Sequence, residues 1–189
     1  MHTKIQFCHP QTERELQQIL DLQALNLPDN ISSEELKQQG YVTVKHNLEL
    51  LSDMNSVVPQ VIAKADDQVV GYALVMVHAF QDKIPVLIPM FQRLAQLTYQ
   101  GSPMTAYNYY VMGQVCIAKA YRGQGIFDSL FQFHRQQFSN EYDFMVTQIS
   151  EHNPRSIAAH RRVGFKLLHA YVDPGVDDWE IVIWDWREH

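Results

Sequence analysis

The chain has 189 residues, of which 46% are hydrophobic and 19% charged, and its 15 Lys and Arg against 21 Asp and Glu give a net charge of -6. This composition is typical of one folded domain and excludes the disordered and fibrous classes. The negative charge disfavours a nucleic-acid partner, and no apolar run approaches the roughly 20 residues that cross a bilayer, so we expect no membrane partner. Two cysteines outside any C-x-x-C pair predict no disulfide framework, no cysteine zinc site and a cytoplasmic protein.

The first third of the chain predicts two helices and a β-hairpin. Two capping patterns, T-x-x-E at 12–15 and S-x-x-E at 32–35, predict helices over about 12–25 and 33–39. From residue 60, the segment VIAKA, a polar turn and the segment VVGYALVMV predict a hairpin. Its second strand is nearly all apolar, which indicates burial on both faces.

The rest of the chain alternates between strands and helices. Residues 78–108 look like an insertion in which Pro89 and Gly101 bracket a helix. The elements expected after it are strands at 109–117, 143–149, 165–172 and 179–185, and helices at 126–138 and 154–163. The last strand, in WEIVIWDW, is typical of an amphipathic edge strand. This order predicts an α/β (or α+β) fold with one domain over residues 1–189.

A glycine-rich turn joins the strand at 109–117 to the helix after it, in the order Arg122, Gly123, Gln124, Gly125. Unpaired amides at a helix N-terminus favour an anion, and glycines let a ligand approach the backbone. Asp128 stands where a Rossmann turn needs its third glycine, and no P-loop motif occurs, so we exclude dinucleotide and ATP sites. A tight strand-to-helix turn with no ligand is the alternative interpretation.

Two segments of this region resemble a known family. Arg122 to Phe127 is similar to the [QR]-x-x-G-x-[GA] pyrophosphate loop of the GNAT superfamily of N-acetyltransferases, which bind acetyl-CoA, although Phe127 stands where Gly or Ala is usual. The family's second signature, N-x-x-[AS]-x-x-x-[YH]-x-x-x-G-F, is matched by Asn153, Ser156, His160, Gly164 and Phe165. The resemblance covers roughly residues 60–185.

The resemblance implies a mixed, mostly antiparallel sheet, flanked by helices and splayed in a V between the strands at 109–117 and 143–149. Pantetheine would lie in that gap against the main chain, because a splayed sheet leaves backbone donors and acceptors unpaired. The implied cofactor-binding residues are Val115, Cys116, Ile117, Arg122, Gly123, Gln124, Gly125, Ile126, Phe127, Asn153 and Ser156.

For the chemistry, the resemblance makes His160 a candidate proton donor to the departing thiolate, with a structural histidine as the alternative. The base is open between Glu151, Tyr110, His152 and His78. Cys116 is expected to be inert in an apolar strand, and the histidine spacing predicts no metal site.

The implied reaction is acetyl transfer from acetyl-CoA to a primary amine of a small molecule by direct attack. The insertion is apolar and carries only three charged residues, so we expect residues 80–108, with the N-terminal helices, to form a pocket for a partly apolar, aromatic or amino-acid-like amine. Capping of the sheet is the alternative role of this segment. Three alternatives stay open for the whole protein: a non-catalytic CoA-binding or regulatory module, acetylation of a protein or peptide amine, and a homodimer.

Overall fold

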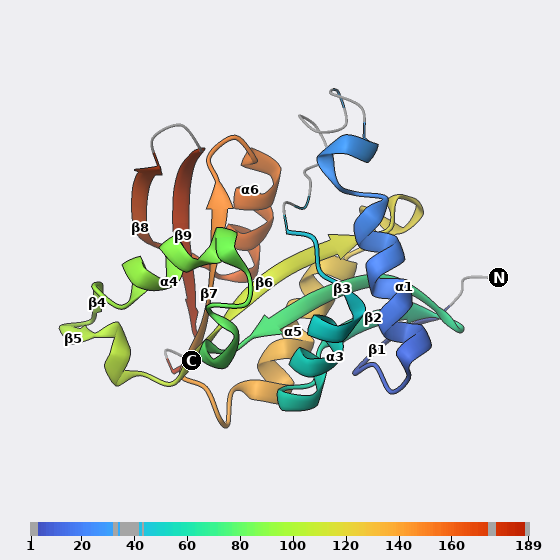
Figure 1. Cartoon of the computed structure of the whole chain (residues 1–189), viewed down its shortest axis with the longest axis horizontal. Coiled ribbons are helices and arrows are strands. Elements are labelled where there is room, and N and C mark those ends of the chain that lie inside the picture. Colours follow the sequence, from blue (N-terminus) through green and yellow to red (C-terminus); the bar gives the residue numbers. More distant parts are fainter. Residues whose placement is uncertain (1–3, 32–33, 35–41, 43, 174–176, 188–189) are drawn as a thin grey trace.

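The computed structural model in Figure 1 describes residues 4–31, 34, 42, 44–173 and 177–187. The helix expected at 33–39 lies largely outside these residues. The described helices are α1 (Glu13–Ala24), α3 (Leu48–Val57), α4 (Ile88–Leu94), α5 (Ile126–Phe138) and α6 (Pro154–Val163). The strands are β1 (Ile5–Cys8), β2 (Val61–Ala65), β3 (Gln68–Met76), β4 (Thr98–Tyr99), β5 (Ser102–Pro103), β6 (Tyr109–Ile117), β7 (Phe144–Ser150), β8 (Lys166–Asp173) and β9 (Asp177–Asp185).

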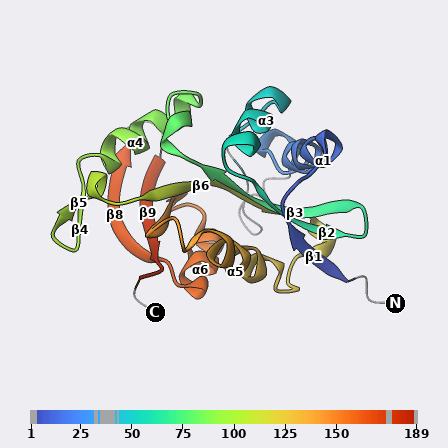
Figure 2. The same ribbon diagram turned by 90° about the horizontal axis from the view of Figure 1, so that it is seen from below.

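A mixed sheet of seven strands forms the centre of the described structure, in the order β1-β2-β3-β6-β7-β9-β8. Its strand pairs are antiparallel except for β6 with β7. Figure 2 shows α5 and α6 on one face of the sheet and α1, α3 and α4 on the other. This confirms the expected fold class, a mostly antiparallel sheet flanked by helices.

The sheet opens between β6 and β7. Their parallel pairing covers only Tyr109–Val111 against Phe144–Val146. Beyond it, β6 stays paired with β3 as far as Ile117, and β7 stays paired with β9 as far as Ser150. The register of β3 against β6 shifts at Gly113, which has no partner opposite it, and such a bulge bends a strand. The expected V-shaped gap is therefore present.

Local signals explain the elements beside this gap. Thr12 and Glu15 form the predicted capping box of α1. The side chain of Asn153 accepts a hydrogen bond from Ser156 N at 3.2 Å, and Pro154 occupies the first position of α6. The apolar face of α5, which includes Leu130 and Phe131, is fully buried against the sheet. The bounds of α5 and α6 agree with the helices expected at 126–138 and 154–163.

The structure corrects two expected elements. The helix of the insertion ends at Leu94, and Gly101 is part of the turn between β4 and β5, where Gln100 and Gly101 both have positive φ. The WEIVIWDW strand does not lie at the edge of the sheet. It belongs to β9, which pairs with β7 on one side and β8 on the other, and its Trp184 packs with Trp186 in the core under α5.

Strand β1 and helix α3 were also missing from the expectations. Strand β1 pairs with β2 at the opposite edge of the sheet, and its four residues are too few to show a period. Helix α3 begins at Asn47, whose side chain accepts a hydrogen bond from Leu50 N at 2.8 Å. That cap, with the buried Leu51 and Met54, was a readable signal.

No helix in the described part of the chain is both long and apolar enough to cross a membrane. Within the same residues, no group of three or more His, Cys, Asp and Glu side chains is placed to hold a metal ion.

Candidate active site

The turn before α5 presents unused backbone donors. Gly123 and Gly125 have φ values of 75° and 76°, a conformation that glycine adopts without strain, and Gly125 is the N-cap of α5. The first hydrogen bond of the helix runs from Ser129 N to Gly125 O, so the helix itself does not use the N–H groups of residues 126–128. A Cβ atom added at either glycine would meet no atom within 4 Å. The donors therefore border open space, as an anion site requires.

A hollow of about 260 Å³ lies against this turn. Every predicted cofactor residue lines it except Gln124, whose side chain donates a hydrogen bond to Ala120 O at 3.1 Å. The lining residues that sequence reasoning missed are Asn26, Val42, Tyr121, Arg155, Ala159 and Arg162. Two of these are arginines seven residues apart on α6, a spacing that places them on one face of the helix and was visible in the sequence.

Arg122 is turned into the protein. Its Nε donates to Ile117 O at 3.0 Å, and its Nη2 donates to Asn26 Oδ1 at 2.5 Å. The guanidinium therefore ties the end of β6 to the residues that follow α1. Arg122 and Arg162 both line the hollow, and Arg162 is paired there with Asp128 at 2.6 Å.

Phe127, which departs from the family pattern, packs between the two helices. Its ring lies 4.7 Å from that of Phe131 and 5.1 Å from that of His160, measured between centroids, and the guanidinium of Arg162 lies 6.0 Å from its centre. The side chain lines the hollow without removing the backbone donors before it. Aromatic packing of α5 on α6 thus accounts for a large residue at this position.

A second hollow, of about 90 Å³, lies in the gap between β6 and β7. Its walls are Met112–Val115 of β6 and Thr147–Ser150 of β7, together with Asn153, Ser156 and His160 near and on α6, Trp179 of β9, and Val42. Val42, Val115, Asn153 and Ser156 also line the first hollow. The two hollows therefore adjoin, and they connect the N-terminus of α5 with the gap in the sheet.

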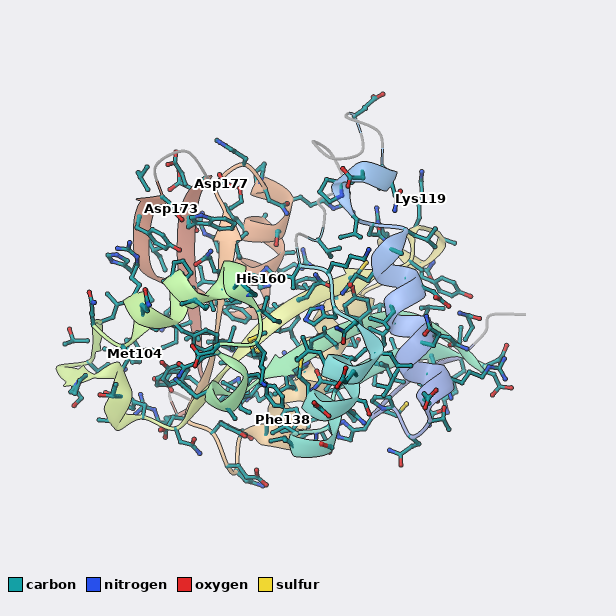
Figure 3. All side chains as sticks on the ribbon, viewed as in Figure 1. Met104, Lys119, Phe138, His160, Asp173 and Asp177 are labelled. Carbon is teal, nitrogen blue, oxygen red and sulfur yellow. The ribbon has the colours of Figure 1, made fainter. Side chains whose placement is uncertain are left out.

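His160 lies at the wall of the second hollow, and Figure 3 places it near the middle of the molecule, away from Asp173 and Asp177 at the β8–β9 hairpin. Its Nδ1 is 2.8 Å from Ser156 O, so Nδ1 carries the proton of the neutral ring, and Nε2 is buried without a hydrogen-bond partner. Burial lowers the pKa of His160 to about 4, although the hydrogen bond to Ser156 acts in the opposite direction. The geometry gives Nε2 a lone pair and no proton at neutral pH.

The residues considered as a base lie outside both hollows. Tyr110 is fully buried, and its hydroxyl is bonded to His134 Nδ1 at 2.9 Å under α5. Glu151 is exposed just beyond β7. His152 Nε2 lies 3.6 Å from an oxygen of Asp177, and His78 Nε2 lies 3.2 Å from the hydroxyl of Tyr109. The structure does not bring these four residues to the gap.

A buried polar network that sequence reasoning missed lies behind Gln114 of the second hollow. Gln114 Oε1 accepts hydrogen bonds from Tyr72 Oη at 2.6 Å and from Gln23 Nε2 at 2.7 Å, and Gln114 Nε2 donates to Val44 O at 2.8 Å. Gln23 also donates to His46 Nδ1 at 2.9 Å, and burial lowers the pKa of His46 to about 4. A lone glutamine in an apolar strand was the signal available in the sequence. The network fixes Gln114 at the wall of the gap.

No residue of 78–108 lines either hollow in the described structure. The buried apolar residues of this segment, Phe80, Ile84, Met90, Phe91, Leu94 and Met104, pack on the sheet instead. Cys116 lines the first hollow, and burial raises the pKa of its thiol to about 12. A thiol with that pKa stays protonated at neutral pH and is a poor nucleophile.

Comparisons with known proteins show the family and the fold of the chain. The model of the acetyltransferase (GNAT) family matches residues 16–165. No curated protein matches the chain. Among solved structures, the fold is similar to that of NAA60 from Arabidopsis thaliana in complex with acetyl-CoA, with a TM-score of 0.66 and 12% identity over 96% of this chain and 99% of that one.

Two further solved structures show the same fold. One is the ribosomal-protein-S18-alanine N-acetyltransferase of Escherichia coli, with a TM-score of 0.63 and 8% identity over 96% of this chain and 94% of that one. The other is a chimera of the spermidine N-acetyltransferase SpeG from Vibrio cholerae and hSSAT, with a TM-score of 0.59 and 12% identity over 97% and 96% of the two chains. Identities this low show a shared fold and leave the substrate open.

Proposed function

Because the chain belongs to the acetyltransferase (GNAT) family, as its two motifs predicted, we propose that it transfers an acetyl group from acetyl-CoA to a primary amine of a small molecule by direct attack. The observation that carries this proposal is the pair of adjoining hollows. One ends at the backbone donors of a helix N-terminus and the other lies in a gap between strands. An elongated ligand with an anion at one end and a reactive group at the other fits this shape.

The residues present fit acetyl-CoA. The open space beside Gly123 and Gly125 lets a pyrophosphate approach the N–H groups at the start of α5. Arg155 brings a positive charge to the same hollow, whereas the charge of Arg162 is paired with Asp128. In the gap, the main chain of Val115–Ile117 has no partner strand on the β7 side and is available to the amides of pantetheine. When bound, acetyl-CoA supplies an activated thioester.

The chain's own groups would orient this thioester and exclude other routes. A main-chain N–H of β6 that faces the gap would stabilise negative charge on the acyl oxygen. Because the thiol of Cys116 keeps its proton, it is a poor nucleophile for forming a covalent acyl-enzyme, and this supports direct attack by the amine. Proton donation by Nε2 of His160 requires a second proton on the ring, and burial lowers the pKa of that ring to about 4, so the ring is neutral at pH 7. The neutral ring has its proton on Nδ1 and has none on Nε2 to give to the departing thiolate.

A small-molecule acceptor is favoured by the size of the second hollow, about 90 Å³, and by its mixed wall of Met112, Trp179 and amide side chains. Acetylation of a protein or peptide amine is the competing substrate class. The two acetyltransferases named above for an alanine of a ribosomal protein and for spermidine share this fold, so the fold by itself favours neither class.

Release of free thiol from acetyl-CoA tests the proposal. The wild-type protein is mixed with a panel of small amines and, separately, with peptides that have a free N-terminus, and Gly125→Asp serves as the variant without a cofactor site. We expect thiol release that depends on a small amine and is absent in the variant. If only the peptides are acetylated, the acceptor is a protein or peptide amine and not a small molecule. Binding of acetyl-CoA without any turnover would favour a non-catalytic CoA-binding or regulatory module.

A further inference from the structure

Gln148 offers hydrogen-bond donors to the second hollow. It lies on β7 two residues after Val146, so its side chain is on the face of the sheet that α4 covers, and it lines the hollow. Its Oε1 accepts a hydrogen bond from the hydroxyl of Tyr171 at 2.6 Å. This bond fixes the orientation of the side-chain amide. Its oxygen is already used as an acceptor, and its NH₂ group remains available as a donor. The NH₂ group has no hydrogen-bond partner among the described residues.

Arg93 of α4 stacks on the ring of the same Tyr171. Its guanidinium carbon lies 3.9 Å from the centre of the phenol ring, which is the distance of a cation–π contact. Arg93 Nε is buried without a hydrogen-bond partner, and Arg93 forms no ion pair with a carboxylate of the described residues. An arginine that is stacked, partly buried and without a carboxylate partner keeps its capacity to bind an anion.

These residues come from three segments, and one phenol ring connects them. Tyr171 belongs to β8, and its ring is the surface on which Arg93 stacks, while its hydroxyl holds Gln148. Arg93 and Tyr171 line neither hollow themselves, but Tyr171 links Arg93 of the insertion to Gln148, which does. The result is a chain of contacts that runs from a cation on α4, through Tyr171, to an amide in the wall of the hollow in which an amine would react.

We propose that Arg93 and Gln148 bind a carboxylate of the acceptor, so that the preferred acceptors are amino acids or similar compounds with a carboxylate close to the amine. This inference rests on the proposed function, because it names the substrate class of the same site. A guanidinium with an amide recognises a carboxylate by charge and by directed hydrogen bonds, and an amine without that group would leave these donors unpaired.

Phenylalanine and phenethylamine test this, because they differ only in the carboxylate. For the wild-type protein we expect kcat/KM to be at least about tenfold higher for phenylalanine. In Arg93→Gln, kcat/KM for phenylalanine should fall by about tenfold or more because KM rises, while kcat/KM for phenethylamine stays within about twofold of the wild-type value. Tyr171→Phe, which keeps the ring and removes the hydroxyl that holds Gln148, should lower the preference partly. Arg14→Gln, which removes an exposed positive charge on α1, is the matched control and should leave the preference unchanged.

A binding experiment keeps the inference testable without turnover. The thermal shift given by N-acetylphenylalanine in the presence of CoA is compared with that given by N-acetylphenethylamine. We expect the wild-type protein to be stabilised more by the carboxylate probe and Arg93→Gln to lose that difference. The melting temperature of the variant and its shift with acetyl-CoA alone report whether it is folded.

The outcomes separate the two proposals. If no amine is acetylated, the proposed function fails, and the binding experiment still decides whether the carboxylate site exists. If amines are acetylated, but phenethylamine, phenylalanine amide or a peptide has a kcat/KM equal to that of phenylalanine, the carboxylate site is wrong and the proposed function stands. An equal preference in the wild-type protein and Arg93→Gln would also overturn the inference.

Discussion

Gly125 and Gly101 have nearly the same φ, 76° and 82°, and an added Cβ would meet no atom within 4 Å at either position. An aspartate therefore has the same conformational cost at both sites, while only position 125 lies at the first hollow. We expect Gly125→Asp to abolish the thermal shift produced by acetyl-CoA, because it adds a side chain and a negative charge beside the helix N-terminus.

Gly101→Asp is the matched control and should keep the full shift, with a similar change in the melting temperature of the unliganded protein. A shift that persists in Gly125→Asp would show that the cofactor does not use the amides at the start of α5.

The second prediction at the residue scale concerns His160. Phenylalanine has a similar shape, and the position is surrounded by the rings of Phe127, Phe131 and Phe165. Because neutral His160 has no proton on Nε2, we expect His160→Phe to lower kcat by less than about tenfold at pH 7 and to leave the affinity for acetyl-CoA unchanged. A fall in kcat of about 10² or more, with unchanged cofactor affinity, would establish the histidine as the proton donor.

At the scale of elements, α4 and the segment around it act as a cover for the sheet. Leu94 is fully buried among Phe91, Met90 and the strand residues of that face. We expect Leu94→Ala to lower the free energy of unfolding by about 2–5 kcal/mol, because it removes buried apolar surface and leaves a cavity. Urea denaturation measures this change.

Leu167→Ala provides the comparison, because Leu167 is 53% exposed on β8 and should change stability little. The affinity of Leu94→Ala for acetyl-CoA, measured where the variant is folded, should stay at the wild-type value. Loss of cofactor binding without loss of stability would contradict a covering role and would place α4 at the cofactor site.

At the scale of the whole molecule, three buried histidines make stability depend on pH. Burial lowers the pKa of His46 and His160 to about 4 and that of His134 to about 3, against 6.5 in the unfolded chain. As the pH falls below 6.5, the unfolded chain binds protons that the folded protein does not, so the free energy of unfolding falls. Each histidine contributes up to about 1.4 kcal/mol per pH unit, and the loss continues until the folded pKa is reached.

Urea denaturation at pH values between 7 and 5 measures this slope in a range where the carboxylates are largely ionised. We expect stability to decrease as the pH falls through the range, and the slope for His160→Phe to be shallower by an amount that approaches one proton at about pH 5. An identical slope in the variant would show that His160 is protonated in the folded protein, contrary to its burial.

Local sequence was sufficient for the parts of the fold that local interactions determine. The capping box of α1, the Asn-Pro start of α6 and the glycine turn before α5 are each formed by a few consecutive residues, so spacing alone identifies them. The two family motifs belong to this class, since all their residues lie within two strand–turn–helix segments. This is why almost every predicted cofactor residue lines the first hollow.

The tertiary structure alone decided which side chains share a surface and which are removed from water. Arg93, Gln148 and Tyr171 lie far apart in the sequence and meet because β7, β9 and β8 are neighbours under α4. The turn of Arg122 toward Asn26 also depends on contacts between distant segments. Burial sets the protonation of His160 in the same way, since the pKa of a histidine depends on the atoms packed around it, and a sequence pattern states only which residues are available.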